Sequence, residues 1–158
     1  MFAEIIELIH YKEVTYYSIL LDGDKESLFH QFVNKMLEKR LNEDLAILKS
    51  FLEKVGNKYG AKKQYFRFEN TADALPPNFV STKHNLRLYC MRINENSVIL
   101  FNGGMKTKST SQESPEVSMH FHDANIYSQK IQIAIKEKEI KINKQGRLVF
   151  SNDFILYL

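Results

Sequence analysis

Positive charge and aromatic rings alternate along the segment Leu86–Ile93, and together they could bind a polyanion. If this segment is a strand, Arg87 and Tyr89 share one face, while the opposite face is apolar and carries Leu86, Leu88 and Cys90. Guanidinium groups bind phosphates and aromatic rings stack on bases, so the pattern favours RNA as the ligand. The alternative is a solvated face that carries no ligand.

Further cations precede and follow this segment. Arg67 lies between aromatic residues in an earlier apolar run, and Lys106 and Lys108 follow the next one. That later run ends in Gly103-Gly104, which lacks both the Walker pattern and the GxGxxG spacing. We therefore predict no nucleotide cofactor. Two interpretations of the glycine pair stay open: a turn that needs positive φ, or a sharp backbone turn beside a phosphate-sized site.

Histidine and cysteine do not indicate a metal or a nucleophile. His120 and His122 are two positions apart in a predicted helix, so they point to different sides and cannot share one ion. Cys90, the single cysteine, lies within an apolar run and reads as a packed structural thiol. The sequence predicts no metal site, no cofactor and no disulfide framework.

The bulk properties describe a globular chain. It has 158 residues, 44% of them hydrophobic, and a formal net charge of +3, which permits a polyanionic partner without requiring one. No stretch is apolar enough to cross a membrane, and Glu4 and Glu7 interrupt the first apolar run. We predict a single domain over residues 1–158, without a membrane partner and cytoplasmic in location.

Periodicity predicts the elements that must position the cations. The expected order is a hairpin of strands over 4–11 and 14–21, helices over 24–40 and 42–59, a strand over 64–68, a loop over 69–85, strands over 86–93 and 98–102, a polar loop over 106–113, a third helix from Ser114-Pro115-Glu116, a hairpin over 139–142 and 147–150, and a strand over 154–158. Asp22 or Asp24 could cap the first helix, and Asn42 the second. The two helices, joined by about two residues, should form a hairpin on the sheet.

The predicted fold class is α+β, with the helices packed on one side of a mainly antiparallel sheet. With the helical hairpin against the Leu86, Leu88 and Cys90 face, Arg87 and Tyr89 would lie on an open face. Residues 1–21 would form an N-terminal β-hairpin extension, and residues 139–158 a C-terminal β extension.

The order of elements over about residues 24–135 resembles the RelE/ParE superfamily of toxins, and within it the HigB-like branch. The resemblance is carried by the strand Leu86-Arg87-Leu88-Tyr89, by the glycine-ended strand that follows it, by the loop 106–110 (KTKST) and by the helix start at 114–116 (SPE). The chain departs from the family in its greater length, in its terminal β segments and in the lack of a matching C-terminal tyrosine or histidine base.

This resemblance implies a RelE-like core and a metal-independent endoribonuclease that cleaves ribosome-bound mRNA and is inhibited by an antitoxin protein. By position, Arg87 and Lys106 correspond to the catalytic cations of the family. His84, His122 and Tyr89 are the candidates for its acid and base, and the candidates for RNA contacts are Arg67, Lys108 and Lys83. Two alternatives stay open: a non-catalytic RelE-like module that binds a protein or nucleic acid, and a structural module that forms a homodimer through its added hairpins.

Overall fold

The structure, a computed structural model, describes residues 1–106 and 115–158. Its centre is a seven-stranded sheet with the order β3-β4-β5-β6-β2-β1-β9. The strands are β1 (Phe2–His10), β2 (Thr15–Leu21), β3 (Arg67–Phe68), β4 (Asp73–Leu75), β5 (Leu86–Asn94), β6 (Ser97–Met105) and β9 (Leu156–Tyr157). A separate hairpin consists of β7 (Lys141–Ile142) and β8 (Leu148–Val149). Within the sheet every neighbouring pair is antiparallel except β2 and β6.

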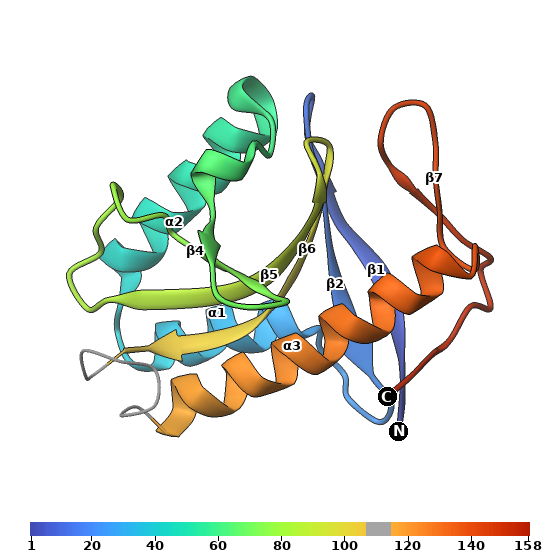
Figure 1. Cartoon of the computed structure of the whole chain (residues 1–158). Coiled ribbons are helices and arrows are strands. Elements are labelled where there is room, and N and C mark those ends of the chain that lie inside the picture. The colour runs from blue at the N-terminus through green and yellow to red at the C-terminus, as the bar shows by residue number, and fades with distance from the viewer. Residues whose placement is uncertain (107–114) are drawn as a thin grey trace.

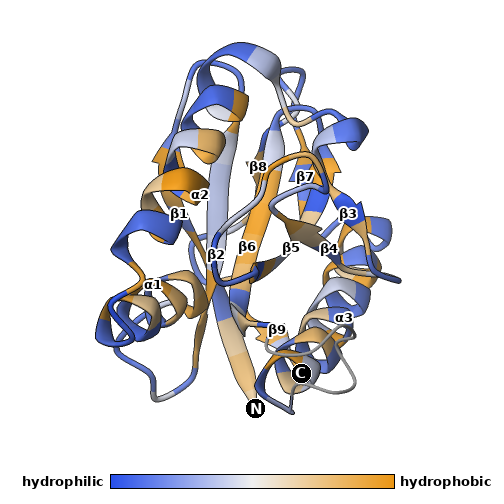
Figure 2. Cartoon of the chain, turned by 90° about the vertical axis from the view of Figure 1, so that its left-hand side faces the viewer, coloured by the Kyte–Doolittle hydropathy of each residue, from blue (hydrophilic) through white to orange (hydrophobic). Residues whose placement is uncertain are grey.

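Helices cover both faces of the sheet (Figures 1 and 2). The helices α1 (Leu28–Glu38) and α2 (Asn42–Lys54) form the predicted hairpin on one face, and α3 (Pro115–Lys136) crosses the other face. The α+β class, the mainly antiparallel sheet, the helical hairpin and the third helix are confirmed. The prediction that every helix lies on one side is wrong for α3, because an apolar stripe requires a partner surface but does not say which face of the sheet supplies it.

Two cores follow from this arrangement. The hairpin core contains Phe32 and Met36 of α1, Leu48 and Leu52 of α2, and Leu88 of β5. The core under α3 is built on the opposite side of the same strands; its members include Tyr17, Ile19, Tyr89, Ile99, Phe101, Val117, Ala124 and Ile131. Side chains of a strand alternate between faces, so neighbouring residues of β5 and β6 contribute to different cores.

The sheet divides between β2 and β6. In the part of the chain that the structure describes, these strands pair only from Thr15↔Ser97 to Ser18↔Leu100, and the rest of β6 has no strand partner on that side. Helix α1 packs there instead, against both β6 and β2. The Ser18 hydroxyl donates to the Leu100 carbonyl oxygen at 2.7 Å and accepts from the Phe29 amide at 3.2 Å, which joins the division point to the first turn of α1.

Several local details differ from the sequence prediction. The α1 N-cap is Ser27, whose hydroxyl accepts from the His30 amide at 3.2 Å, and not Asp22 or Asp24. The α2 N-cap is Leu41, without a side-chain bond, so Asn42 is the first helical residue. The predicted loop 69–85 contains β4, a short strand that is held by pairing with both β3 and β5.

Both ends of the chain are attached to the rest of the protein by hydrogen bonds. The Leu158 amide donates to the Met1 carbonyl oxygen at 2.9 Å, next to the β1–β9 pair, so the two termini lie together (Figure 1). The β7–β8 hairpin is attached through the Gly146 carbonyl oxygen, which accepts from Ser97 Oγ at 2.7 Å and from Asn94 Nδ2 at 2.9 Å. Across the described ranges, the structure contains no helix with the length and apolar character that a membrane span requires.

Candidate functional site

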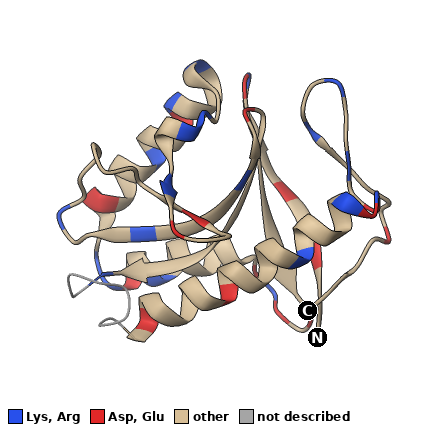
Figure 3. Ribbon diagram, in the orientation of Figure 1, with Lys and Arg blue, Asp and Glu red and all other residues tan. Residues whose placement is uncertain are grey.

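The structure brings Arg67 and Arg87 together on one face of the sheet. Pairing aligns Arg67 with Ala74 and Ala74 with Tyr89, so Arg67 and Tyr89 lie in one row across β3, β4 and β5. Arg87 is two residues before Tyr89 on the same strand and therefore shares that face. Burial lowers the pKa of Arg87, and the nearby positive charge of Arg67 lowers it further. Figure 3 shows blue segments on both β3 and β5, where these arginines lie.

Each guanidinium is held by neutral groups. Arg67 Nε donates to the Pro76 carbonyl oxygen at 2.7 Å and Arg67 Nη1 donates to Asn78, while Arg87 Nη1 donates to the Leu86 carbonyl oxygen at 2.9 Å. Within residues 1–106 and 115–158, neither arginine has a carboxylate oxygen within 4.0 Å. Two half-buried guanidinium groups that share one face and lack an ion pair within this distance have spare donors for a phosphate, which arginine binds through paired hydrogen bonds.

Tyr89 is not at an open face. Its side chain is 1% exposed and its ring lies against Phe121 of α3, with 5.7 Å between ring centroids. Burial raises the pKa of Tyr89, and the negative charge of Glu69 raises it further. The predicted open face is covered here because α3 crosses it. Tyr89 therefore packs between the sheet and α3, and a substrate could contact it only if α3 moved.

Glu69 is the residue that sequence reasoning missed. It lies in the turn between β3 and β4, where its amide donates to the Ala72 carbonyl oxygen at 3.2 Å. Its negative charge raises the pKa of both Arg87 and Tyr89. The segment looked like a loop without structure, and the only signal was an acidic residue two positions after Arg67.

The remaining predicted residues lie in two places. The Lys106 amide donates to the Asn85 carbonyl oxygen at 2.9 Å, so Lys106 emerges beside the start of β5. His84 and Lys83 are tied to the hairpin side instead: both backbone amides donate to the buried carboxylate of Asp44 on α2, at 2.8 and 3.1 Å, and His84 Nδ1 is 3.1 Å from Asp44 Oδ2. His84 is therefore bonded to α2, the helix on the hairpin side of the sheet. Lys108 lies outside the described residues.

The glycine pair lies within β6, where the chain does not turn. Gly103 pairs with Leu88 and Gly104 with Arg87, neither glycine has positive φ, and the strand continues to Met105. Both predictions of a turn are therefore wrong. The glycines are needed for close approach: a Cβ on Gly103 would overlap the Arg87 carbonyl oxygen, and a Cβ on Gly104 would lie 3.0 Å from Glu116 Oε1.

A second polar cluster joins α1, β6 and α3. Lys35 Nζ lies 2.8 Å from Glu116 Oε1, 2.9 Å from the Gly103 carbonyl oxygen and 3.0 Å from His120 Nε2. An ammonium group only donates hydrogen bonds, so His120 Nε2 accepts and its imidazole is neutral, with the proton on Nδ1. Burial lowers the pKa of His120 to about 4, and the charge of Lys35 adds to the effect. This cluster fastens the N-terminal half of α3 over the sheet.

Chemically, the arginine pair with Glu69 can bind a phosphate and offer a carboxylate beside it. No group of three or more histidine, cysteine or acidic side chains in the described parts of the chain is placed to hold a metal ion. No protein-family model, no curated protein and no solved structure matches the chain.

Proposed function

We propose that the protein is a RelE-like, RNA-binding endoribonuclease that cleaves ribosome-bound mRNA through the site formed by Arg67, Arg87 and Glu69. The observation that carries the proposal is the placement of two half-buried guanidinium groups on one face of the sheet, neither with a carboxylate oxygen within 4.0 Å among the residues that the structure describes. The order of elements over about residues 24–135, which resembles the RelE/ParE toxins, adds to it. On this proposal an antitoxin protein inhibits the activity in the cell.

The reaction follows from the groups at the site. The 2′-oxygen of the substrate attacks the adjacent phosphorus, the P–O5′ bond breaks, and a cyclic phosphate and a 5′-hydroxyl form. Glu69 accepts the proton of the 2′-hydroxyl, and water supplies the proton to the departing 5′-oxygen. Arg67 and Arg87 bind the non-bridging oxygens and stabilise the charge that grows on the phosphorane. Lys106 adds a phosphate contact at the start of β5.

The test is cleavage of a ribosome-bound message by the purified protein, mapped by primer extension. Removing one preorganised charge from such a site typically costs 10²–10³ in rate, so Arg87→Ala and Arg67→Ala are each expected to lower cleavage about 100-fold. Glu69→Gln should abolish most of the cleavage and leave RNA affinity nearly unchanged. Arg147→Ala, which removes a guanidinium from the β7–β8 hairpin, is the matched control and should cleave like the wild type.

A second function, RNA binding without cleavage, is favoured by one observation. Tyr89 is buried against Phe121 and His84 is bonded to Asp44, so two of the expected acid and base side chains are already engaged in contacts within the protein. Fluorescence anisotropy with a labelled single-stranded RNA separates the two functions. Binding that falls about tenfold in Arg87→Ala, without cleavage by the wild type, would establish the binding module. Neither binding nor cleavage by the wild type would refute both proposals.

A further inference from the structure

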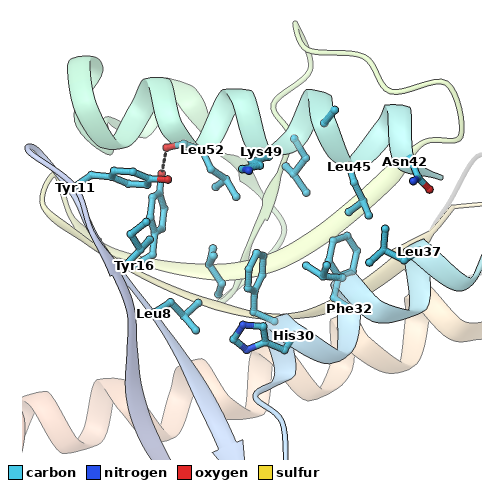
Figure 4. Close-up of a pocket in the computed structure, with 16 residues that line it drawn as sticks. Leu8, Tyr11, Tyr16, His30, Phe32, Leu37, Asn42, Leu45, Lys49 and Leu52 are labelled. Carbon is cyan, nitrogen blue, oxygen red and sulfur yellow. Dashed lines mark hydrogen bonds between the residues drawn. The ribbon is translucent and has the colours of Figure 1, made fainter. Parts of the chain in front are cut away.

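An apolar cavity of about 560 Å³ lies between α1 and α2 and reaches β1 and β2 (Figure 4). Its deepest walls are the fully buried side chains of Phe32, Leu48 and Leu100, and half-buried Val33 and Leu45 line its sides. This volume is within the range of sites that bind small molecules. The cavity lies on the opposite side of the sheet from Arg67 and Arg87, so it is independent of the proposed RNA site.

The cavity is a built feature of the hairpin. At one end Tyr16 Oη donates to the Leu52 carbonyl oxygen at 2.8 Å, the dashed line in Figure 4, and the edge of the Tyr11 ring meets Tyr16 with 6.0 Å between ring centroids. This contact fixes α2 to β2 at a set distance. At the other end the short turn through Arg40, which has a φ of 60°, joins the helices. The cavity lies between these two ends.

The walls favour a hydrocarbon over water. Water in such a space would lose hydrogen bonds, because the Tyr16 hydroxyl at its end is already bonded to Leu52 and the deep walls are hydrocarbon. A flexible apolar tail gains about 0.8 kcal/mol for each methylene group that it buries. The apolar side chains of Ile9 and Leu37 line the cavity and are partly exposed, at 43% and 45%, so the apolar surface continues to the mouth.

Charge at the cavity selects the head group of the ligand. Among the sixteen lining residues Lys49 is the one lysine or arginine and none is acidic, while His30, Asn42 and the hydroxyl groups of Tyr11 and Tyr16 supply the other polar groups. The nearest carboxylate partner of Lys49 is Glu53, at 4.0 Å, and both side chains are exposed, so this pair is weak and leaves the ammonium group accessible. The cavity therefore combines an apolar interior with a single positive charge.

We propose that the α1–α2 cavity binds a monomeric medium-chain fatty acid, with its tail between the helices and its carboxylate at Lys49. The commitment to a carboxylate rests on the sign of the charge, and the commitment to one flexible tail rests on the volume and the apolar walls.

The proposal is tested with the full chain, by isothermal titration with dodecanoate below its micelle concentration and by the change in Tm that dodecanoate causes. We expect saturable one-to-one binding and a Tm that rises with ligand concentration. Val33→Phe, which fills the cavity from α1, should remove binding while the protein stays folded. Lys49→Ala should weaken dodecanoate binding about tenfold and leave dodecanol binding unchanged. Lys54→Ala, at an exposed position on α2 outside the cavity, is the matched control and should bind like the wild type.

Three results would overturn the proposal. The first is wild-type protein that shows no saturable binding of dodecanoate, or that binds only vesicles of anionic phospholipid. The second is full binding by folded Val33→Phe, which would place the ligand elsewhere. The third is equal weakening of dodecanoate and dodecanol by Lys49→Ala, which would remove the head-group assignment.

Discussion

Gly103→Ala tests the closest approach in the sheet. A Cβ at this position would overlap the Arg87 carbonyl oxygen and lie 2.9 Å from the Arg87 carbonyl carbon and 3.0 Å from Leu88 Cα. All three atoms belong to the backbone of β5, so no side chain can rotate away. Relief requires the new Cβ and the Arg87 carbonyl oxygen to move apart to at least 3.0 Å, so β5 and β6 must separate locally by more than about 1 Å.

The expected loss of unfolding free energy combines two costs and one gain. Overpacking in a buried position costs about 1–3 kcal/mol, and each ladder hydrogen bond that lengthens costs about 1 kcal/mol. Against this, alanine is favoured over glycine in a strand by about 0.5–1 kcal/mol. We therefore expect the free energy of unfolding to fall by about 3 kcal/mol, which lowers Tm by about 6–12 °C for a domain of this size. The assay is urea unfolding, with the midpoint and the slope fitted separately.

Gly104→Ala is the matched control. Its new Cβ would lie 3.0 Å from Glu116 Oε1, the end of a flexible side chain, so the neighbour can move and the stability should change by at most about 1 kcal/mol. If both variants unfold at the wild-type urea concentration with an unchanged slope, the close packing of β5 on β6 is refuted, and with it the explanation of the glycine pair.

Three further predictions concern single titratable groups. His120 has a folded-state pKa of about 4, below its ordinary value of 6.5, so its contribution to stability is lost as the pH falls from 6.5 toward 4. The His120→Gln variant should lose less stability over that range, and an NMR titration should give the low pKa directly. Burial raises the pKa of Asp73, so its contribution is favourable below the ordinary value of 3.8 and is lost as the pH rises through the folded-state pKa; in urea unfolding, Asp73→Asn should become more stable relative to the wild type as the pH rises from 3 to about 6. Burial also raises the pKa of the Cys90 thiol, so a thiol reagent should label it only when the protein unfolds, and rapid labelling of the native protein would contradict its burial.

The sequence by itself determined the elements whose periodicity is strong. The apolar stripe of α1 predicted that Phe32 and Met36 are buried, and the alternation of β5 predicted the same for Leu88 and Cys90. All four side chains lie in the hairpin core. This works because side-chain direction follows directly from local backbone geometry, with a period of 3.6 in helices and 2 in strands. The same geometry placed Arg87 on the face opposite to Leu88 before any tertiary contact was known.

Shorter elements depend on contacts that the local sequence does not encode. Strand β4 has three residues and precedes Pro76, and it exists because β3 and β5 pair with it on both sides. The charge of Glu69, in the turn that joins β3 to β4, acts on Arg87 only because β4 pairs with β5. An acidic residue in a predicted loop could not be assigned to the site, since its neighbours there are about 18 positions away in the chain.

Only the tertiary structure decided which face each helix covers. The apolar stripe of α3, with Val117 and Ile131, indicates that the helix buries one side. Either face of the sheet could cover that side. In the structure α3 covers the Tyr89 face, which was predicted to be open. Lys35 of α1 contacts Glu116 and His120 of α3 in this arrangement. The cavity between α1 and α2 has the same origin, because its size depends on how far Tyr16 and Leu52 hold two elements apart, a distance that no local pattern contains.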